Sequence, residues 1–266
     1  MSEVVKKHYN ENVLREKERL SNPYSNIEFQ TTIHMIKKYF KKEGHILDIG
    51  CGPGRYSIEL LKNGYEVTLY DISKEELKIA RLDIEKLNMK ANDYVCGDGT
   101  DLHRFSDNSF DGILLMGPMY HVHDKYIRED ILKNVKRILK EDGLALIAYL
   151  NGFGVVKSSI HEYSEGFLNY KDILELLSKN IWSKEESFTE TYLSNPDESK
   201  KEIESSGFEI VTYFGAEGFA SGIHTDIIKM SNEENECYKN LVRLCKETCE
   251  MKEYRDSTEH THFIVK

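Results

Sequence analysis

The sequence predicts an α/β fold, with a mostly parallel sheet covered by helices on both faces. Between residues 45 and 150, short apolar runs alternate with segments whose apolar residues recur at helical spacing. With 266 residues, of which 39% are hydrophobic and 31% charged, the chain can bury a sizeable core. Strands joined in this way by helices run parallel with right-handed crossovers, so the helices cover both faces of the sheet.

The individual elements follow from the same apolar pattern. A helix is expected over residues 27–40, because Phe29, Ile33, Ile36 and Phe40 share one face. The later strands and helices are expected, in chain order, at 45–50, 56–63, 66–70, about 73–87, 94–96, 110–115, 126–140 and 144–149. A capping box of Ser73 and Glu76 opens the helix at 73. Gly143 is expected to close the helix that ends at 140.

After residue 150 the alternation stops. Residues 151–196 show no second strand–helix unit and are rich in aromatic side chains. The elements expected beyond them are a helix at about 197–206, a strand at 208–214, a helix from a capping box of Ser231 and Glu234 to about 250, and a strand at 260–265. The last two strands suggest an antiparallel addition to the sheet edge. On such an edge strand, His260 and His262 would be surface residues.

The charge and the cysteines limit the classes of function. The formal net charge is −10, and residues 151–266 alone carry 13 Lys/Arg against 22 Asp/Glu. Because phosphate contacts need clustered cations, nucleic acid is disfavoured as a partner. No membrane partner is expected, since no stretch approaches 18 uncharged apolar residues. Five cysteines without a secretory signal predict reduced thiols and a cytoplasmic protein.

The sharpest motif is the string from Leu47 to Tyr56, in which a strand ends in a glycine turn and feeds a helix. Its glycines at 50, 52 and 54 give G-x-G-x-G, which differs from the G-x-G-x-x-G fingerprint of dinucleotide sites. Pro53 removes one backbone N–H from the loop, so the loop is less suited to bind a phosphate group tightly. Asp48 would repel a pyrophosphate but suits a ligand with an ammonium group.

Two more acids follow the next two strands. Asp71 ends the second strand, where a carboxylate can accept hydrogen bonds from both hydroxyls of a ribose. Asp98 follows the third strand in Gly97-Asp98-Gly99-Thr100 and could accept from an adenine amino group. Three acids at successive strand ends favour, as the ligand, a nucleoside that carries a cation over a nucleotide with phosphates.

With these motifs, residues 27–150 resemble a class I S-adenosylmethionine-dependent methyltransferase, and strands 208–214 and 260–265 resemble it more loosely. The resemblance implies a Rossmann-like sheet of seven strands whose last strand is antiparallel, with helical additions at the N-terminus and as a lid. It implies S-adenosyl-L-methionine as methyl donor. The cofactor-binding residues that follow from the motifs and the resemblance are Asp48, Gly50, Gly52, Gly54, Tyr56, Asp71, Ile72, Asp98, Gly99, Thr100 and Met116.

The expected division of the chain assigns each segment a task. It comprises N-terminal helices over the cofactor site (1–44), the cofactor core (45–150), an acceptor lid (151–196) and the end of the sheet (197–266) with a helical insertion at about 216–256. The acceptor is expected to be a small molecule, neutral or cationic, because the lid combines aromatics with acids. The oligomeric state stays open. Methylators of nucleobase or protein amide nitrogens often carry Asn/Asp-Pro-Pro-Tyr/Phe where this chain has Gly117-Pro118-Met119-Tyr120, so that class is less favoured.

Methyl transfer to an O, N or S atom needs alignment in a dry pocket and, for some acceptors, a base. His121 and Tyr120, directly after the fourth strand, are the catalytic candidates, with His123 and His34 as outside candidates. No metal site is expected, because nothing completes the pair His121 and His123 with Asp124.

Three other functions remain open. A nicotinamide-dependent oxidoreductase of the short-chain type would need Tyr-x-x-x-Lys past the fourth strand, and the only such spacing is Tyr70 to Lys74. An RNA or protein methyltransferase would need a basic groove or a recognition domain. A non-catalytic regulator or partner subunit would bind S-adenosylmethionine without turnover.

Overall fold

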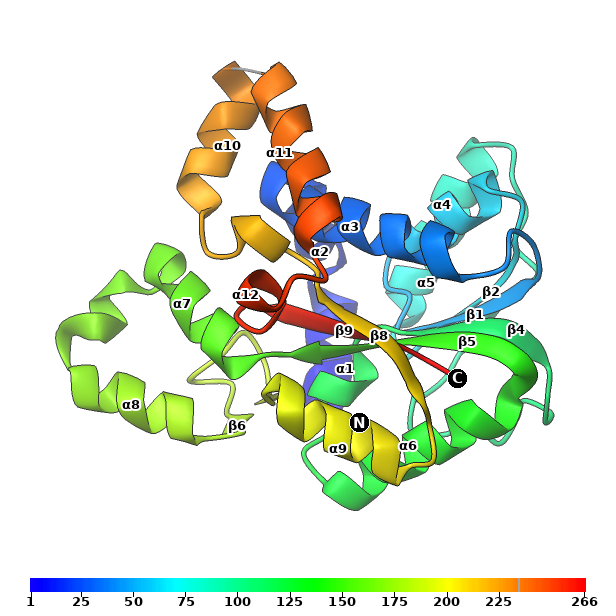
Figure 1. Cartoon of the computed structure of the whole chain (residues 1–266). Helices are drawn as coiled ribbons and strands as arrows, with labels where there is room; N and C mark the ends of the chain where they lie inside the picture. The colour runs from blue at the N-terminus through cyan, green and yellow to red at the C-terminus, as the bar shows by residue number, and fades with distance from the viewer. Residues whose placement is uncertain (234) are drawn as a thin grey trace.

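A computed structural model describes residues 1–233 and 235–266 (Figure 1). Seven strands form the main sheet in the order β3-β2-β1-β4-β5-β9-β8. They are β1 (His45–Ile49), β2 (Glu66–Asp71), β3 (Asp93–Cys96), β4 (Phe110–Leu115), β5 (Leu139–Leu150), β8 (Ile210–Gly215) and β9 (His260–Val265). β9 runs antiparallel to both of its neighbours, while β1 to β5 pair in parallel. The predicted α/β fold with an antiparallel last strand is confirmed.

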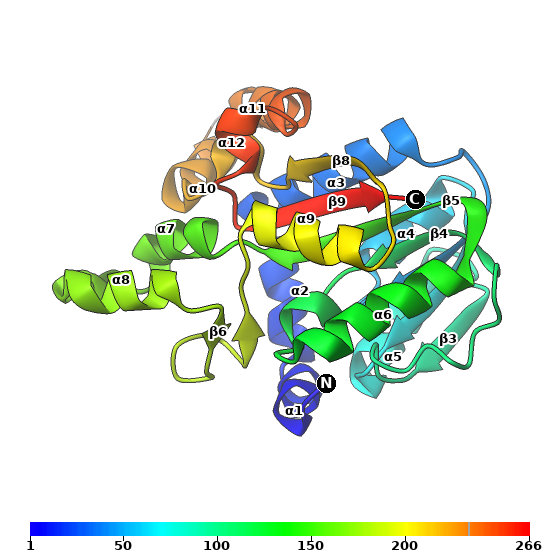
Figure 2. The same ribbon diagram turned by 60° about the horizontal axis from the view of Figure 1, so that its bottom comes forward.

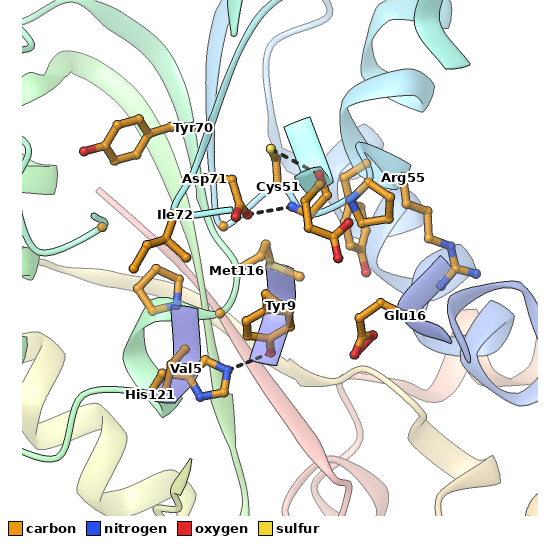
Figure 3. Close-up of a pocket in the computed structure, with 18 of the residues that line it drawn as sticks. Val5, Tyr9, Glu16, Cys51, Arg55, Tyr70, Asp71, Ile72, Met116 and His121 are labelled. Carbon is orange, nitrogen blue, oxygen red and sulfur yellow. Dashed lines mark hydrogen bonds between the residues drawn. The ribbon is translucent and has the colours of Figure 1, made fainter. Parts of the chain in front are cut away.

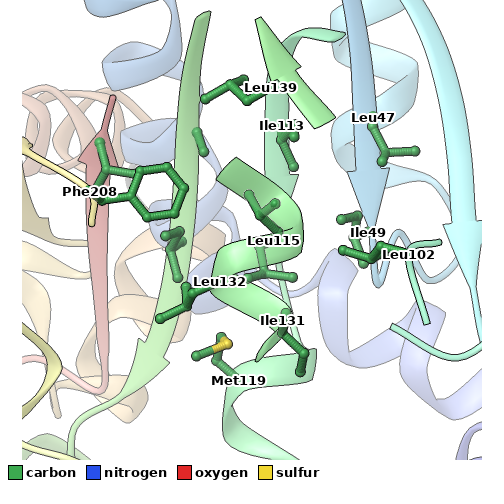
Figure 4. Packing of buried hydrophobic residues seen from close by; sticks show 14 of the residues in the cluster. Leu47, Ile49, Leu102, Ile113, Leu115, Met119, Ile131, Leu132, Leu139 and Phe208 are labelled. Atoms are coloured by element: carbon green, nitrogen blue, oxygen red, sulfur yellow. The ribbon is translucent and has the colours of Figure 1, made fainter. Parts of the chain in front are cut away.

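The sheet is buried on both faces because its strands are apolar almost throughout. One face packs on α6 (Lys125–Ile138) and α9 (Pro196–Ser205), where Leu47, Ile113 and Leu115 meet Ile131 and Leu132 (Figure 4). The other face packs on α3 (Pro23–Tyr39), α4 (Arg55–Lys62) and α5 (Lys74–Lys86). Successive residues of a strand alternate between the two clusters, as the period of two in a β-strand requires.

The remaining helices lie around this core. α1 (Glu3–Glu11) and α2 (Val13–Ser21) precede α3. A lobe of α7 (Gly152–Glu162), α8 (Tyr170–Ser178) and the hairpin β6 (Ile181–Trp182) with β7 (Thr191–Tyr192) projects to one side (Figure 2). α10 (His224–Glu233), α11 (Asn235–Thr248) and α12 (Lys252–Arg255) separate β8 from β9. Among the described residues, no helix combines the length and the apolar character needed to cross a membrane.

Several predicted boundaries were wrong, for reasons that lie in the backbone pairing. α6 ends at Ile138, and β5 begins immediately at Leu139, which pairs with Phe110 before a register shift in the β4–β5 ladder. Gly143 therefore lies inside a strand and does not stop the helix. Likewise, β8 begins at Ile210 and not at residue 208.

Two helix starts also differ from the predictions. α3 begins four residues early, because the Asn22 side chain caps it by accepting from Ser25 N–H, and Pro23 occupies the first turn. Ser231 does not begin a helix, since α10 already runs from His224 through it. Glu234, the other half of that predicted capping box, lies outside the described residues.

The last two strands add antiparallel at the edge of the sheet, beside β5, as predicted, but the expectation that the final strand is itself the edge strand was wrong. β9 lies between β5 and β8, so β8 is the edge strand (Figure 1). His262 is consequently fully buried, with Nδ1 3.1 Å from the Thr32 hydroxyl, and is not a surface residue. Because β9 is antiparallel, its first residue, His260, lies at the carboxyl ends of the parallel strands, beside Leu150 of β5.

Candidate active site

A large cavity lies at the carboxyl edge of the sheet, under α1 and α2 (Figure 3). It encloses about 940 Å³ that protein atoms do not fill, including space open to solvent. Its walls come from the turns after β1, β2, β3 and β4, from the N-terminal helices and from the start of β9. Ligands of open α/β sheets bind at this edge, because the loops there diverge.

The glycine turn after β1 forms one wall by close backbone approach. Gly50 N–H donates to the Tyr70 carbonyl at 2.8 Å, and a Cβ on Gly50 would lie 2.1 Å from the Met116 carbonyl oxygen. Gly50 has φ +76°, which side-chain-bearing residues rarely adopt. Beside Gly52, apart from its two chain neighbours, no atom of the described residues lies within 4 Å of the space that a Cβ would take, so the loop leaves room for a ligand.

Asp71 connects this loop to the end of β2. One carboxylate oxygen accepts from Gly52 N–H and the other from Ser73 N–H, both at 2.8 Å. Burial raises the pKa of Asp71, while the backbone N–H groups of Ser73, Gly52 and Ile72 oppose that rise. The carboxylate is thus fixed at the cavity wall, with remaining lone pairs for a ligand's hydroxyls.

The structure brings most of the predicted cofactor residues together and leaves four aside. Those that line the cavity are Gly50, Gly52, Tyr56, Asp71, Ile72, Gly99 and Met116. Asp48, Gly54, Asp98 and Thr100 are not among the lining residues. Gly54 instead caps α4 with φ +81° and packs against Ala80.

Asp48 points into the protein and not into the cavity. It is fully buried, and its Oδ2 accepts from the Ser57 hydroxyl at 2.6 Å. Burial raises its pKa to about 7, with Asp71 adding to the rise and Ser57 opposing it. Asp48 therefore holds the start of α4 against β1. Its Oδ1 has no hydrogen-bond partner among the described residues.

Asp98 and Thr100 bond mainly to each other. Asp98 Oδ1 accepts from both the backbone N–H and the hydroxyl of Thr100, each at 2.9 Å. Asp98 Oδ2 accepts from the Met1 nitrogen at 2.7 Å. The neighbouring Gly97 and Gly99 are the residues of this turn that line the cavity.

The catalytic candidates Tyr120 and His121 both line the cavity. His121 Nδ1 lies 3.1 Å from the Glu190 carbonyl oxygen, and Nε2 lies 2.8 Å from the Tyr9 hydroxyl. A carbonyl only accepts hydrogen bonds, so Nδ1 carries the hydrogen and Nε2 accepts from Tyr9. Burial lowers the pKa of His121 to about 4, which keeps the imidazole neutral at physiological pH.

Sequence reasoning missed the cavity residues that α1, α2 and α3 supply. Tyr9, Glu16, Arg19 and Glu28 line the cavity, with Arg19 Nε 2.7 Å from a Glu16 oxygen. The Tyr56 hydroxyl donates to Glu28 at 2.9 Å. No motif marks these residues, because only tertiary packing brings residues 9–28 over the glycine turn.

Two further lining residues carry acid–base groups that were not predicted. Glu76 is almost fully buried, neither of its oxygens has a hydrogen-bond partner among the described residues, and burial with the charge of Asp71 raises its pKa to about 8. The Ser73 capping box is therefore only half formed: Ser73 accepts from Glu76 N–H, but the Glu76 carboxylate does not reach back. The second residue is His260. Within the described ranges, no three His, Cys, Asp or Glu side chains group as a metal site.

Comparisons with known proteins match the part of the chain that runs from β1 into β5. Residues 47–147 match the family model described as a methyltransferase domain. The chain is 30% identical over 179 residues to a ubiquinone biosynthesis O-methyltransferase of Rickettsia typhi, which covers 60% of this chain and 70% of the relative. It is 28% identical over 193 residues to a ubiquinone/menaquinone biosynthesis C-methyltransferase of Pseudoalteromonas translucida, covering 69% and 74%.

A solved structure extends the likeness to nearly the whole chain. An S-adenosylmethionine-dependent methyltransferase from Thermotoga maritima superposes with a TM-score of 0.58, covering 97% of this chain and 98% of that one. Its sequence identity is 18%, so the match shows a shared fold.

Proposed function

The chain belongs to the class I S-adenosylmethionine-dependent methyltransferases, and from this premise we propose that it methylates an O, N or S atom of a small-molecule acceptor. The observation that carries the proposal is the meeting, in one cavity, of the glycine turn, Asp71 and a buried neutral His121. The first two suit the methyl donor, and the third suits an acceptor that loses a proton.

The residues of the cavity fit the methyl donor of this family. S-adenosyl-L-methionine supplies an electrophilic methyl group carried on a sulfonium. The space beside Gly52 leaves room for its amino-acid part at the β1 turn, and Asp71 would accept from its ribose hydroxyls. The turn of Gly97 and Gly99 would face its base. The carboxylates that line the cavity make the surroundings of the sulfonium favourable to positive charge.

His121 is the proposed proton acceptor. The Glu190 carbonyl fixes the tautomer with the hydrogen on Nδ1, so the Nε2 lone pair faces the cavity side. The Tyr9 hydroxyl now donates to that lone pair. An acceptor hydroxyl, thiol or amine can take the place of Tyr9, or pass its proton through the Tyr9 hydroxyl, while the burial of the site excludes water.

The acceptor is proposed to be small, and neutral or cationic. The cavity is partly roofed by α1 and α2, and Glu16, Glu28 and Asp71 line it beside Tyr120. Aromatic and acidic groups together suit such a ligand. The names of the Rickettsia and Pseudoalteromonas relatives point to quinone precursors for those proteins, which supports an oxygen or a ring carbon near a hydroxyl as the atom to test first.

Calorimetry tests the cofactor assignment. Asp71→Ala is expected to raise the Kd for S-adenosylmethionine at least tenfold, about 1.4 kcal/mol, because it removes the acceptor for the ribose hydroxyls. Asp142→Ala, at an exposed surface position, is the matched control and should leave the Kd unchanged. Binding of NAD alone, or an unchanged Kd in the Asp71 variant, would contradict the assignment. A panel of phenols, thiols and amines, read by S-adenosylhomocysteine release, then separates an enzyme from a binding-only protein.

A further inference from the structure

His260 reaches the cavity from the side opposite to the ribose acid. It is the first residue of β9 and pairs with Leu150 at the end of β5. Between β9 and β2, which carries Asp71, lie β5, β4 and β1. Four strand spacings of about 4.8 Å give roughly 19 Å between the two strand ends. His260 therefore belongs to the part of the cavity beyond the adenosine-binding turns.

A single buried carboxylate holds His260 in place. Glu217 follows β8, and only 2% of its side chain is exposed. Its Oε1 lies 2.6 Å from His260 Nδ1, and its Oε2 accepts from the His260 backbone N–H at 3.1 Å. Both oxygens of Glu217 thus bind the same residue. Together the two hydrogen bonds fix the plane of the His260 imidazole ring.

The other ring nitrogen is left for a ligand. Among the described residues, no hydrogen bond engages Nε2 of His260, although the ring lines the cavity and its side chain is 23% exposed. A ring held at Nδ1 and open at Nε2 presents a single directed polar group to the cavity.

The charges around His260 favour the imidazolium. Burial opposes it, but the charge and hydrogen bond of Glu217, with Glu28 of α3 and Glu259 beside it, raise the pKa of His260 to about 9. His262, the nearest ring on the same strand face, has its pKa lowered to about 3 by burial and stays neutral. Nε2 of His260 consequently carries a hydrogen at neutral pH and acts as a donor.

We propose that His260 is an acceptor-binding residue whose Nε2–H donates a hydrogen bond to a second oxygen of the acceptor, a carbonyl or phenol oxygen, and that Glu217 is its positioning residue. The inference deepens the proposed function and rests on it. His121 takes the proton of the group to be methylated, and His260 recognises a different oxygen on the same molecule. The acceptor class is then a ring that carries a hydroxyl together with a carbonyl or a second oxygen.

The test compares two probes in the presence of saturating S-adenosylhomocysteine. 5-Hydroxy-2,3-dimethyl-1,4-naphthoquinone is uncharged at neutral pH and carries two carbonyl oxygens besides its hydroxyl, and 2-naphthol, also uncharged, carries only the hydroxyl. Calorimetry at neutral pH should show that His260→Gln weakens the naphthoquinone at least fivefold and leaves 2-naphthol unchanged. His103→Gln, at an exposed position, is the matched control and should alter neither probe.

Glu217→Gln gives an independent readout of the same pair. A glutamine oxygen still accepts from Nδ1–H, but without the carboxylate charge the ring becomes neutral at a lower pH, and Nε2 changes from donor to acceptor. NMR of the ring nitrogens should show that His260 is still an imidazolium at pH 8 in the wild type. In Glu217→Gln the titration midpoint of His260 should be lower. This variant should weaken naphthoquinone binding as His260→Gln does.

The outcomes separate this inference from the proposed function. If the wild type binds no S-adenosylhomocysteine, the proposed function fails. If it does bind, the inference is overturned by a wild type that does not prefer the naphthoquinone, by equal naphthoquinone affinity in His260→Gln, or by a neutral His260 ring at neutral pH.

Discussion

Gly50 and Gly64 both have positive φ angles, +76° and +90°, yet their surroundings differ. At Gly50 a Cβ would lie 2.1 Å from the Met116 carbonyl oxygen, in a backbone that lines the cavity. At Gly64, the turn after α4, nothing lies within 4 Å of an added Cβ. At Gly50 a side chain would therefore clash with the neighbouring backbone, whereas at Gly64 only the backbone conformation disfavours a side chain.

Alanine at the two glycines should therefore have unequal effects. Gly64→Ala is expected to lower the free energy of unfolding by about 1–2 kcal/mol, the cost of a left-handed conformation, and to leave cofactor affinity unchanged. Gly50→Ala should cost more stability and weaken S-adenosylmethionine at least tenfold, because Met116 and the β1 turn must separate. Denaturant unfolding and calorimetry measure both quantities. Equal effects of the two variants would contradict the steric interpretation.

At the same scale, residue type alone did not predict which acids face the cavity. Asp48, Asp71 and Asp98 all lie near the carboxyl ends of strands, but Asp48 bonds to Ser57 and, of the three, only Asp71 lines the wall. The difference depends on side-chain direction and on which neighbour offers a donor. Neither can be derived from spacing along the chain.

At the scale of elements, a buried ion pair joins α6 to α9. Arg128 Nη2 lies 2.8 Å from Glu202 Oε2, and both side chains are under 10% exposed. Arg128 Nη1 also donates to the carbonyls of Val122 and His123, in the segment that directly follows His121. The guanidinium lies 3.6 Å from the centre of the Tyr192 ring on β7. One side chain thus connects two helices, the lobe and the loop that carries the proposed base.

Removing Glu202 should be strongly destabilising. Glu202→Ala leaves the Arg128 guanidinium buried without its carboxylate, and we expect a loss of about 3–5 kcal/mol in the free energy of unfolding. The double variant Arg128→Met with Glu202→Leu removes both charges and should recover most of that loss. Urea unfolding of the three proteins measures it. A double variant that is no more stable than Glu202→Ala would show that packing, and not the stranded charge, sets the cost.

Most elements were predictable because their apolar period is strong and their ends carry recognisable residues. The errors came where pairing between distant strands sets the position of an element. β5 begins at Leu139 because Phe110 pairs with it, and β9 lies inside the sheet because β8 pairs on its far side. For the same reason, only the part of the site that lies in the strand-end motifs was predictable. Tyr9, Glu28 and His260 reach the cavity only through packing between distant segments.

At the scale of the whole molecule, several groups among the described residues bind protons more tightly in the folded state, and four of them do so near neutral pH. The pKa values of Asp48 and Glu259 are raised to about 7, that of Glu76 to about 8 and that of His260 to about 9. Burial raises the pKa values of the three acids. At His260 burial lowers the pKa, and the charges of Glu217, Glu28 and Glu259 with the Glu217 hydrogen bond together outweigh it. Each raised value stabilises the fold at low pH and loses that contribution as pH rises through it.

Stability should accordingly fall between pH 6.5 and about 9. Below pH 6.5, histidines with lowered pKa values oppose the acids, among them the buried His121 and His262 and the half-buried His224. Above pH 6.5 these histidines are neutral in both the folded and the unfolded state, so they no longer change the stability. Only the loss of stability from the groups with raised pKa values then remains. Denaturant unfolding at several pH values measures the slope, and Glu217→Gln should make it shallower because His260 then titrates lower. A rising or flat profile in this interval would contradict the assignment.

The antiparallel β9 has a consequence for how the protein is made. Leu150 and His260 pair across 110 positions of sequence, with the lobe, α9, β8 and the helices α10 to α12 between them. During synthesis, residues 45–150 leave the ribosome well before His260 does, so the five parallel strands can form while the far wall of the cavity is still missing. Methyl-donor binding can thus precede acceptor binding in the life of each molecule. A nascent chain that already holds the donor has no complete site in which to use it.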